Sequence, residues 1–523
     1  TTGASSAFCN PFFMLCAPDA TEFNGDAYGF NLVYSGSHMG CVEVSPWGKT
    51  RVAAGIQPEG FAWTLAPGER FETPEAVLAF SRAGKNGMSA NLHAFVQEHI
   101  VRGKWAKKDR PVLLNNWEAT YFDFNERKLL SLAKDAAKLG AELFVLDDGW
   151  FGARDNDAKG LGDYTVNRKK LPGGLAGLAE KVHALGLLFG LWFEPEMVNP
   201  DSDLYREHPD WVLQAAPRTP ILQRHQLVLD LANPEAFDHV YRAIHDVLSQ
   251  YRIDYIKWDH NRYLLEAGSN LHGGAASIHN QTVAYYRLLD KLRADFPDIE
   301  WESCASGGGR IDTGVIEHVQ RCWTSDMTDA LSRQCIQRWT VQNIAPEYLG
   351  AHISQPTSQQ TGRTYSVAFR AATAVFHSFG IEWDITKASD ADLQELASWI
   401  VWYKANRDFL HSGRFVRLDV ADPAVLAHGV VAADGSRALI AHVQYEESSS
   451  NRGVWLRVPG LDADARYALR WVGPEPARAS LEPIDPLGPV GSRSVSGAWL
   501  ASPGVRVPRC RPETVRLVEI VKV

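Results

Sequence analysis

The fold is decided by stretches such as Ile253-Asp254-Tyr255-Ile256-Lys257-Trp258-Asp259, an apolar run that ends in a carboxylate. Similar apolar runs alternate with amphipathic helical segments from about Pro111 to Asn406. They lie at residues 112–114, 143–146, 187–192, 227–229, 253–256, 299–301, 319–323 and 348–351. Eight such units over about 300 residues match the size of a (β/α)8 TIM barrel. A doubly wound parallel sheet would alternate in the same way, so pattern alone leaves closure open.

Shorter, turn-punctuated strands flank this segment on both sides. We therefore expect an α/β protein with three parts: a β-rich part at 1–90, the barrel at 91–410 and an antiparallel β-sandwich at 411–523. The last part contains a candidate hairpin, in which Val425–Val431 and Ala438–Tyr445 flank an Asp434-Gly435 turn.

Bulk composition excludes several kinds of partner. The 523 residues carry a net charge of −9 with no basic block, so nucleic acid is a poor partner. No apolar run is long enough to span a bilayer. The seven scattered cysteines lack metal-type spacing and favour a reducing, cytoplasmic compartment, although a chain that starts at Thr1 says nothing about export. We expect no metal and no other cofactor.

Polar residues follow nearly every apolar run, at positions that lie on the C-terminal rim of a barrel, where active sites form. They are Trp117-Glu118, Asp147-Asp148, Glu194, Glu196, Asp230, Asp259, Glu302, Asp326 and His352. Carboxylates gathered at one end repel each other and lose hydration, which favours a functional interpretation. The alternative is that each acid caps the helix that follows it.

Lys257 and Asp259 are two residues apart in one strand, so they share a face. A nearby ammonium favours the ionised carboxylate, as a nucleophile requires. A structural ion pair is the alternative, but such a pair is expensive inside a barrel. The spacing therefore indicates that Asp259 is a nucleophile.

Asp326 lies between Trp323 and Met327 in sequence and would face the anionic Asp259. A less polar setting and a like charge both raise a carboxyl pKa, which suits a general acid. Two carboxyl groups with opposed pKa shifts perform retaining glycoside hydrolysis. Asp329 competes for the role of acid, but capping of the next helix is the simpler interpretation of it.

Five motifs resemble the bacterial-type α-galactosidases of glycoside hydrolase family thirty-six, and the likeness runs over essentially the whole chain. They are Asp147–Gly152, Gly190–Met197, Lys257–Asp259 with Asn261-Arg262, Glu302–Cys304 with Ser306–Arg310, and Trp323–Asp326. The resemblance implies a retaining, exo-acting α-galactosidase of raffinose- or melibiose-type oligosaccharides, with Asp259 as nucleophile and Asp326 as proton donor. The sugar contacts that it implies are Asp147, Asp148, Arg224, Lys257, Asn261, Cys304 and Gly307, with Trp117 and Trp192 as pocket walls. Barrel packing explains Trp192 equally well.

Some residues depart from the family pattern. His225 and Met327 stand where the family usually shows Asn, and His260 replaces an apolar residue. Residues 1–90 resemble only the tail of the family's N-terminal β-sandwich, a piece of which completes a neighbouring subunit's site. We therefore expect a remnant of that sandwich and a more open pocket. We do not expect a tight tetramer, although a homo-oligomer stays open.

Other functions stay open at this point. A metal-dependent hydrolase could use Asp147, Asp148, Glu194 and Glu196 as ligands, but the expected His ligands are missing at the strand ends. A Schiff-base enzyme could use Lys257, although Asp259 would favour its ammonium form. A non-catalytic sugar-binding protein is a third alternative. Within the family, α-N-acetylgalactosaminidase or α-galactosyl transferase activity is the nearest alternative, and Cys304 favours a plain 2-OH over an acetamide.

Overall fold

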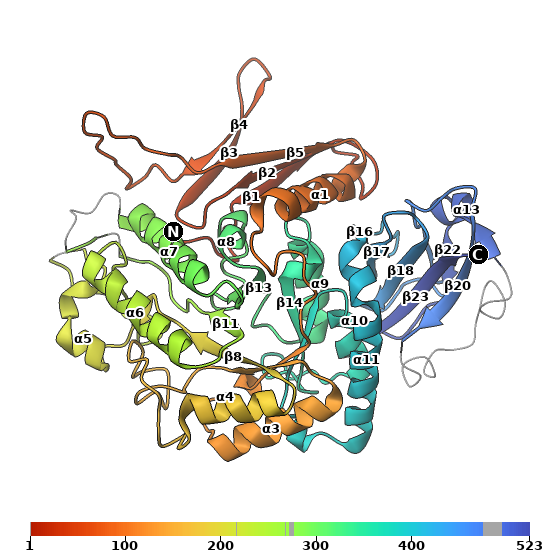
Figure 1. Ribbon diagram of the computed structural model, residues 1–523. Helices are drawn as coiled ribbons and strands as arrows, with labels where there is room; N and C mark the ends of the chain where they lie inside the picture. Colours follow the sequence, from red (N-terminus) through yellow and green to blue (C-terminus); the bar gives the residue numbers. More distant parts are fainter. Residues whose placement is uncertain (1, 216, 267, 271–276, 474–493) are drawn as a thin grey trace.

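A closed barrel of parallel strands lies at the centre of the computed structural model, which describes residues 2–523 except 216, 267, 271–276 and 474–493 (Figure 1). Around the barrel the strand order is β11-β12-β13-β14-β15-β6-β7-β8. The strands are β6 (Leu113–Asn115), β7 (Leu143–Leu146), β8 (Leu188–Phe193), β11 (Tyr255–Trp258), β12 (Glu300–Ser303), β13 (Arg321–Trp323), β14 (Leu349–Ser354) and β15 (Ser378–Glu382). The prediction of a TIM barrel is confirmed, and the doubly wound sheet is excluded.

Helices surround the barrel, and α3 shows why they form where they do. The Asn125 side chain accepts a hydrogen bond from the backbone N–H of Lys128, and Gly140 ends α3 at a left-handed φ of 93°. The barrel helices are α3 (Glu126–Leu139), α4 (Gly174–Ala184), α6 (Pro234–Gln250), α7 (Ser277–Asp295), α8 (Thr313–His318), α9 (Ala330–Thr340), α10 (Val367–Ala374) and α11 (Asp390–Ser412). Within the described residues, no helix combines the length and apolarity needed to cross a bilayer.

One predicted barrel strand is wrong. The run at 227–229 forms β10 (Leu227–Val228), which pairs antiparallel with β9 (Met197–Val198) outside the barrel. The eighth barrel strand is instead β15, which begins only a few residues after α10. A short apolar run has no periodicity that distinguishes a barrel strand from a strand outside the barrel. The end of α10 is itself apolar, so the sequence does not show where α10 ends and β15 begins.

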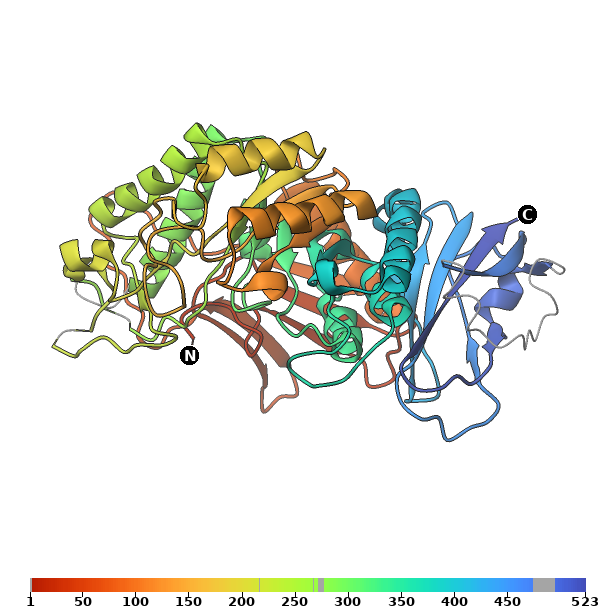
Figure 2. The same cartoon turned by 90° about the horizontal axis from the view of Figure 1, so that it is seen from below.

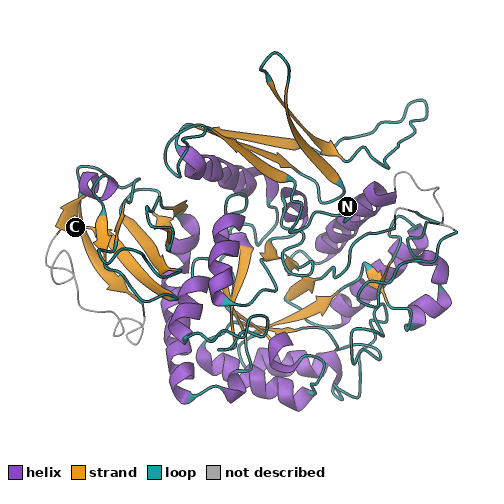
Figure 3. Cartoon of the chain, turned by 180° about the vertical axis from the view of Figure 1, so that it is seen from behind, coloured by secondary structure: helices purple, strands orange, loops and turns teal. Residues whose placement is uncertain are grey.

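The N-terminal part packs a small sheet over the barrel (Figures 1 and 3). It contains β1 (Phe12–Cys16), β2 (Ala27–Leu32) and β5 (Ala76–Ser81), which pair antiparallel in the order β1-β2-β5, and the helix α1 (Gly84–Phe95). The hairpin β3 (His38–Val44) and β4 (Thr50–Ile56) projects away from the rest of the molecule.

The C-terminal part is an antiparallel β-sandwich beside α10 and α11 (Figure 2), as predicted. Its large sheet contains β16 (Arg414–Arg417), β17 (Val425–Val431), β18 (Arg437–Gln444), β23 (Thr514–Lys522), β20 (Arg466–Val472) and β21 (Ser494–Ser496). The pair β19 (Val454–Leu456) and β22 (Val505–Val507) covers it, and apolar side chains from both sheets form one core. The predicted hairpin is β17–β18.

The barrel interior contains a buried ion pair where the sequence predicted a rim residue. Glu302 Oε2 lies 2.9 Å from Arg321 Nε, and the two side chains are 2% and 0% exposed. Glu302 was expected at the opening of the barrel. Its carboxylate instead lies inside, because the Arg321 guanidinium on the neighbouring strand binds it. Removal of either partner would leave a buried charge uncompensated.

We predict that Glu302→Ala lowers the free energy of unfolding by about 3–5 kcal/mol, because Arg321 would stay buried without its partner. Chemical denaturation followed by circular dichroism measures this loss. The matched control is Asp203→Ala, which breaks an ion pair with Arg206 whose side chains are 78% and 54% exposed, and should cost under about 1 kcal/mol. Equal losses in the two variants would contradict the prediction.

Candidate active site

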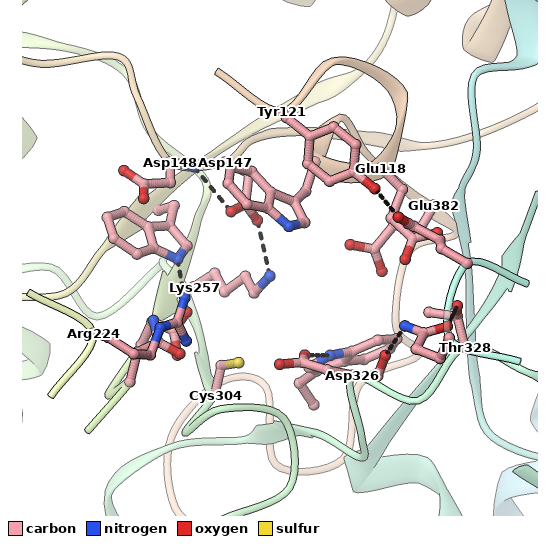
Figure 4. Close-up of a pocket in the computed structure, with 17 residues that line it drawn as sticks. Glu118, Tyr121, Asp147, Asp148, Arg224, Lys257, Cys304, Asp326, Thr328 and Glu382 are labelled. Atoms are coloured by element: carbon pink, nitrogen blue, oxygen red, sulfur yellow. Dashed lines mark hydrogen bonds and ion pairs between the residues drawn. The ribbon is translucent and has the colours of Figure 1, made fainter. Parts of the chain in front are cut away.

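The C-terminal ends of the barrel strands open into a pocket of about 360 Å³ (Figure 4). The predicted site residues that line it are Trp117, Asp147, Asp148, Trp192, Arg224, Lys257, Asp259, Asn261, Cys304 and Asp326. Of the predicted set, Gly307 alone is absent from the wall. Side chains that are far apart in sequence thus meet at one end of the barrel.

Two cations hold the aspartates at the end of β7. Lys257 Nζ donates to Asp147 Oδ2 at 2.8 Å, and the Arg154 guanidinium binds both carboxylate oxygens of Asp148. Burial favours a neutral amine, but Asp147 and the other acids around it raise the pKa of Lys257 well above its ordinary value. The sequence predicted a pairing of Lys257 with Asp259, whereas its hydrogen-bonded partner is Asp147.

Asp259 follows β11 directly and receives several hydrogen bonds. Trp192 Nε1 donates to Oδ2 at 3.1 Å, and the backbone N–H of His260 donates to Oδ1 at 2.8 Å. Burial opposes ionisation, but the Lys257 charge and these donors, with the Asn261 side chain, lower the pKa of Asp259 below its ordinary value. Trp192 therefore both packs in the barrel and contacts the pocket.

Asp326 follows β13 and lies across the pocket from Lys257 (Figure 4). Water reaches its side chain through the open pocket, although protein atoms surround it on the other sides. Burial and the negative charge of Asp259 raise the pKa of Asp326 to about 6, against the opposing influence of Lys257 and of Trp323 Nε1, which donates to Oδ1 at 2.8 Å. One carboxyl is thus ionised while the other retains its proton in mildly acidic solution.

The competing acid Asp329 has a structural role. Its Oδ1 accepts a hydrogen bond from the backbone N–H of Ser332 at 2.8 Å and caps α9, as predicted. Oδ2 is bound by Thr361 and Arg363, and Asp329 does not line the pocket.

The sequence placed Glu118 on the rim without giving it a role, and several other pocket residues were not predicted as site residues. They are Tyr121, Trp323, Thr328, Gln359, Gln360 and Glu382. Glu382 ends β15, so recognition of that strand would have placed its carboxyl on the rim with the others. Burial raises the pKa of Glu382 against the opposing charge of Lys257, and burial together with Glu382 raises the pKa of Glu118. The glutamines lie on a loop, which has no periodic signal.

Gly307 supports the pocket from behind. A Cβ at this position would lie 2.5 Å from the backbone nitrogen of Asp326, and the residue has a left-handed φ of 82°. Arg224 and His225 also have positive φ values, 52° and 59°, in a tight turn between Gln223 and Gln226. Asn tolerates this conformation well, which explains physically why an Asn suits position 225.

Two family profiles match the chain up to residue 413. The melibiase family profile matches residues 70–413, and the glycosyl hydrolase family 36 N-terminal domain matches residues 1–66. Alpha-galactosidase AgaA from Geobacillus stearothermophilus is 44% identical over 90% of this chain. Alpha-galactosidase C from Emericella nidulans is 43% identical over 90% of it. The chain spans 65% and 63% of the lengths of these two relatives.

Solved structures of alpha-galactosidases are also similar to this chain. A crystal structure of substituted AgaA from Geobacillus stearothermophilus in complex with raffinose superposes with a TM-score of 0.93 at 40% identity, and covers 100% of this chain and 71% of that one. A second substituted form, in complex with stachyose, gives the same values. The alpha-galactosidase from Lactobacillus brevis has a TM-score of 0.93 at 38% identity, with 100% of this chain and 69% of that one covered.

We predict that Gly307→Ala destabilises the protein by several kcal/mol, because the added Cβ must displace the Asp326 backbone and also strains a left-handed residue. Gly362→Ala is the matched control, since Gly362 has a φ of 72° but no atom would lie within 4 Å of an added methyl group, so only about 1–2 kcal/mol is lost. Thermal denaturation compares the two. A loss at Gly362 as large as that at Gly307 would show that close approach plays no part.

Proposed function

The chain belongs to the melibiase family, and from that premise we propose that it is a retaining, exo-acting glycoside hydrolase that removes terminal α-galactosyl residues from oligosaccharides. One observation carries the proposal: an ionised carboxyl, Asp259, and a protonated carboxyl, Asp326, line a single pocket at the C-terminal end of the barrel. Relatives named as alpha-galactosidases, one of them crystallised with raffinose and another form with stachyose, support galactosides as substrates.

The reaction proceeds by double displacement. Asp259 attacks the anomeric carbon while Asp326 gives its proton to the departing glycosidic oxygen, so that a covalent glycosyl-enzyme forms. Asp326, now ionised, takes a proton from water, which attacks the same carbon and releases the sugar with retained configuration. The hydrogen bonds from Trp192 and His260 aim the attacking carboxylate, and they require no reorganisation when the reaction begins.

The buried end of the pocket supplies the groups that hold the terminal sugar. Asp147 and Asp148 accept hydrogen bonds from sugar hydroxyls, and ion pairs with Lys257 and Arg154 hold the two carboxyl groups in place. Cys304, which is 2% exposed at the edge of the pocket, leaves room for a hydroxyl.

The same contacts weigh against two other functions. Three of the four carboxylates named as possible metal ligands already bind cations, Asp147 to Lys257, Asp148 to Arg154 and Glu196 to Arg310. A Schiff base requires a neutral amine, but the raised pKa of Lys257 keeps it an ammonium. The pairing of opposed carboxyls therefore favours glycoside hydrolysis.

We also propose a reducing, cytoplasmic setting for the reaction. Cys9, Cys16 and Cys41 are exposed free thiols. Exposed thiols persist best where the compartment keeps them reduced.

Asp259→Ala should reduce kcat/KM for an aryl α-galactoside by about 10³-fold or more, because no other group can form the covalent intermediate. A 2-fluoro-galactoside with an activated leaving group should label Asp259, as mass spectrometry of the digested protein would report. The control is Asp329→Asn, which keeps the oxygen that caps α9 and should retain activity. Labelling of another carboxyl, or full activity of Asp259→Ala, would refute the assignment.

The pH dependence follows from the two opposed pKa shifts. In the free enzyme kcat/KM should fall above a pH of about 6, where Asp326 loses its proton, and at acidic pH below 3.8, where Asp259 gains one. Asp326→Asn should abolish the alkaline limb and lower kcat/KM for an oligosaccharide by about 10²–10⁴-fold, with a smaller loss for an aryl galactoside that needs little protonation. An unchanged alkaline limb in Asp326→Asn would assign that limb to another group.

A further inference from the structure

His352 is the rim residue to which double displacement gives no direct part. The sequence placed it at the end of a barrel strand, and it lies in β14 with a side chain that is 4% exposed. It does not line the pocket, whereas its neighbours Trp323 and Glu382 do. Any influence of His352 on a bound sugar must therefore pass through those two residues.

Three contacts connect Glu382 to the acid. Glu382 Oε2 lies 3.1 Å from His352 Nδ1, which fixes the rotation of the imidazole. The imidazole lies against the Trp323 indole, with centroids 4.1 Å apart and planes 31° from parallel. The indole Nε1 in turn donates to Asp326 Oδ1 at 2.8 Å. The four residues come from three neighbouring barrel strands, β15, β14 and β13, or directly follow them.

The strand register provides the space for the two rings. Trp323 pairs with Gly350 on β14, and His352 pairs with Gly380 on β15. A Cβ at Gly350 would lie 3.2 Å from Trp323 Cε3, and a Cβ at Gly380 would lie 2.4 Å from His352 Cδ2. The Arg333 guanidinium also lies 4.8 Å from the centre of the indole ring. Each ring therefore occupies room that a side chain on the next strand would fill, and neither can tilt freely.

The imidazole does not carry protons. Burial lowers the pKa of His352 well below its ordinary value, and the cations around it lower that pKa further. The charged groups that face the ring are Arg321, Arg333, Lys257, Glu302 and Glu382. The ring is therefore neutral at the pH where the acid works, which excludes it as a second acid and leaves it a role in orientation.

The indole N–H distinguishes the two oxygens of the acid. Within the described residues, the only hydrogen bond to the Asp326 carboxyl comes from Trp323 Nε1 and goes to Oδ1. Oδ2 is thus left to carry the transferable proton. The same bond favours the ionised carboxyl, against burial and the charge of Asp259. The other ionisable groups that face Asp326 are Lys257, Cys304, Glu118, Arg333 and Glu382.

We propose that His352 is a positioning residue for the general acid, an inference that rests on the proposed function. The Glu382–His352 pair holds the Trp323 indole in the orientation in which its N–H meets Oδ1 of Asp326. Oδ2 then presents its proton to the departing glycosidic oxygen. His352 acts only through Trp323 and does not touch the substrate.

Trp323→Phe tests the last contact, because it keeps an aromatic ring against His352 and removes the N–H. The pKa of Asp326 should rise, since the lost bond favoured the ionised form, and the alkaline limb of kcat/KM for raffinose should move up by about one pH unit. Below that limb kcat/KM should fall about tenfold, because the acid is no longer oriented. Trp499→Phe is the matched control. It removes an indole N–H that donates to the Gly504 carbonyl at 3.1 Å in the C-terminal part, and it should change neither quantity.

His352→Asn separates the stacked ring from the bond to Glu382. The Asn amide can still donate to the Glu382 carboxyl, but no ring remains against the indole. The alkaline limb should move up by about half a pH unit. The double variant with Trp323→Phe should shift no further than Trp323→Phe alone, because His352 acts through an N–H that is already missing. Full addition of the two shifts would overturn the proposal.

A measurement without substrate makes the test independent of activity. Infrared difference spectroscopy of the free protein can follow the protonated carboxyl band that disappears in Asp326→Asn. The midpoint of its titration should rise in Trp323→Phe and, by less, in His352→Asn. An unmoved midpoint in either variant would overturn the positioning role. A wild-type protein that cleaves neither raffinose nor p-nitrophenyl α-galactoside would instead overturn the proposed function itself.

Discussion

The buried ammonium of Lys257 is the charge on which the pocket depends. Burial alone would neutralise it, but Asp147 at 2.8 Å, with Asp259 and Glu382 nearby, keeps it protonated. Its charge in turn lowers the pKa of Asp259. One ammonium cannot offset every acid in a small volume of low polarity, so the carboxyls divide into ionised and protonated groups. The division is what separates a nucleophile from an acid.

The strand that carries Lys257 is fixed from its outer face as well. Trp258, which points away from the pocket, donates through Nε1 to Glu196 at 2.9 Å, and Arg310 binds both oxygens of that carboxylate. Beyond Asp259, the backbone N–H of Asn261 donates to Glu194 at 2.7 Å. Both glutamates were expected at the rim of the site. Their carboxyl groups instead lie outside the pocket. They accept hydrogen bonds from Trp258 and Asn261 and so hold the segment that carries Asp259.

Local rules predicted the features that depend on neighbours in the chain. Period two placed Lys257 and Asp259 on one face, and an Asp before a helix predicted the cap at Asp329. The partner of Lys257 could not be predicted, because Asp147 follows β7, which β8 separates from β11, and the sequence does not show that the closed barrel brings the two side chains together. The error at 227–229 and the missed strand β15 have a similar cause. Strands buried on both faces lack alternation, so a few apolar residues do not reveal which sheet they join.

The part of the pocket that could be predicted from the sequence and the part that could not are built from different elements. Its buried end is built from strand ends, whose positions are set by the closed barrel and can be inferred from a repeating pattern. Its mouth is built from loops, where Tyr121 meets Gln359 only because two segments more than 200 residues apart come together. A change in such a loop alters the mouth of the pocket without moving a barrel strand. The positions of the two carboxyls therefore depend on the rigid barrel, while the shape of the mouth depends on the loops above it.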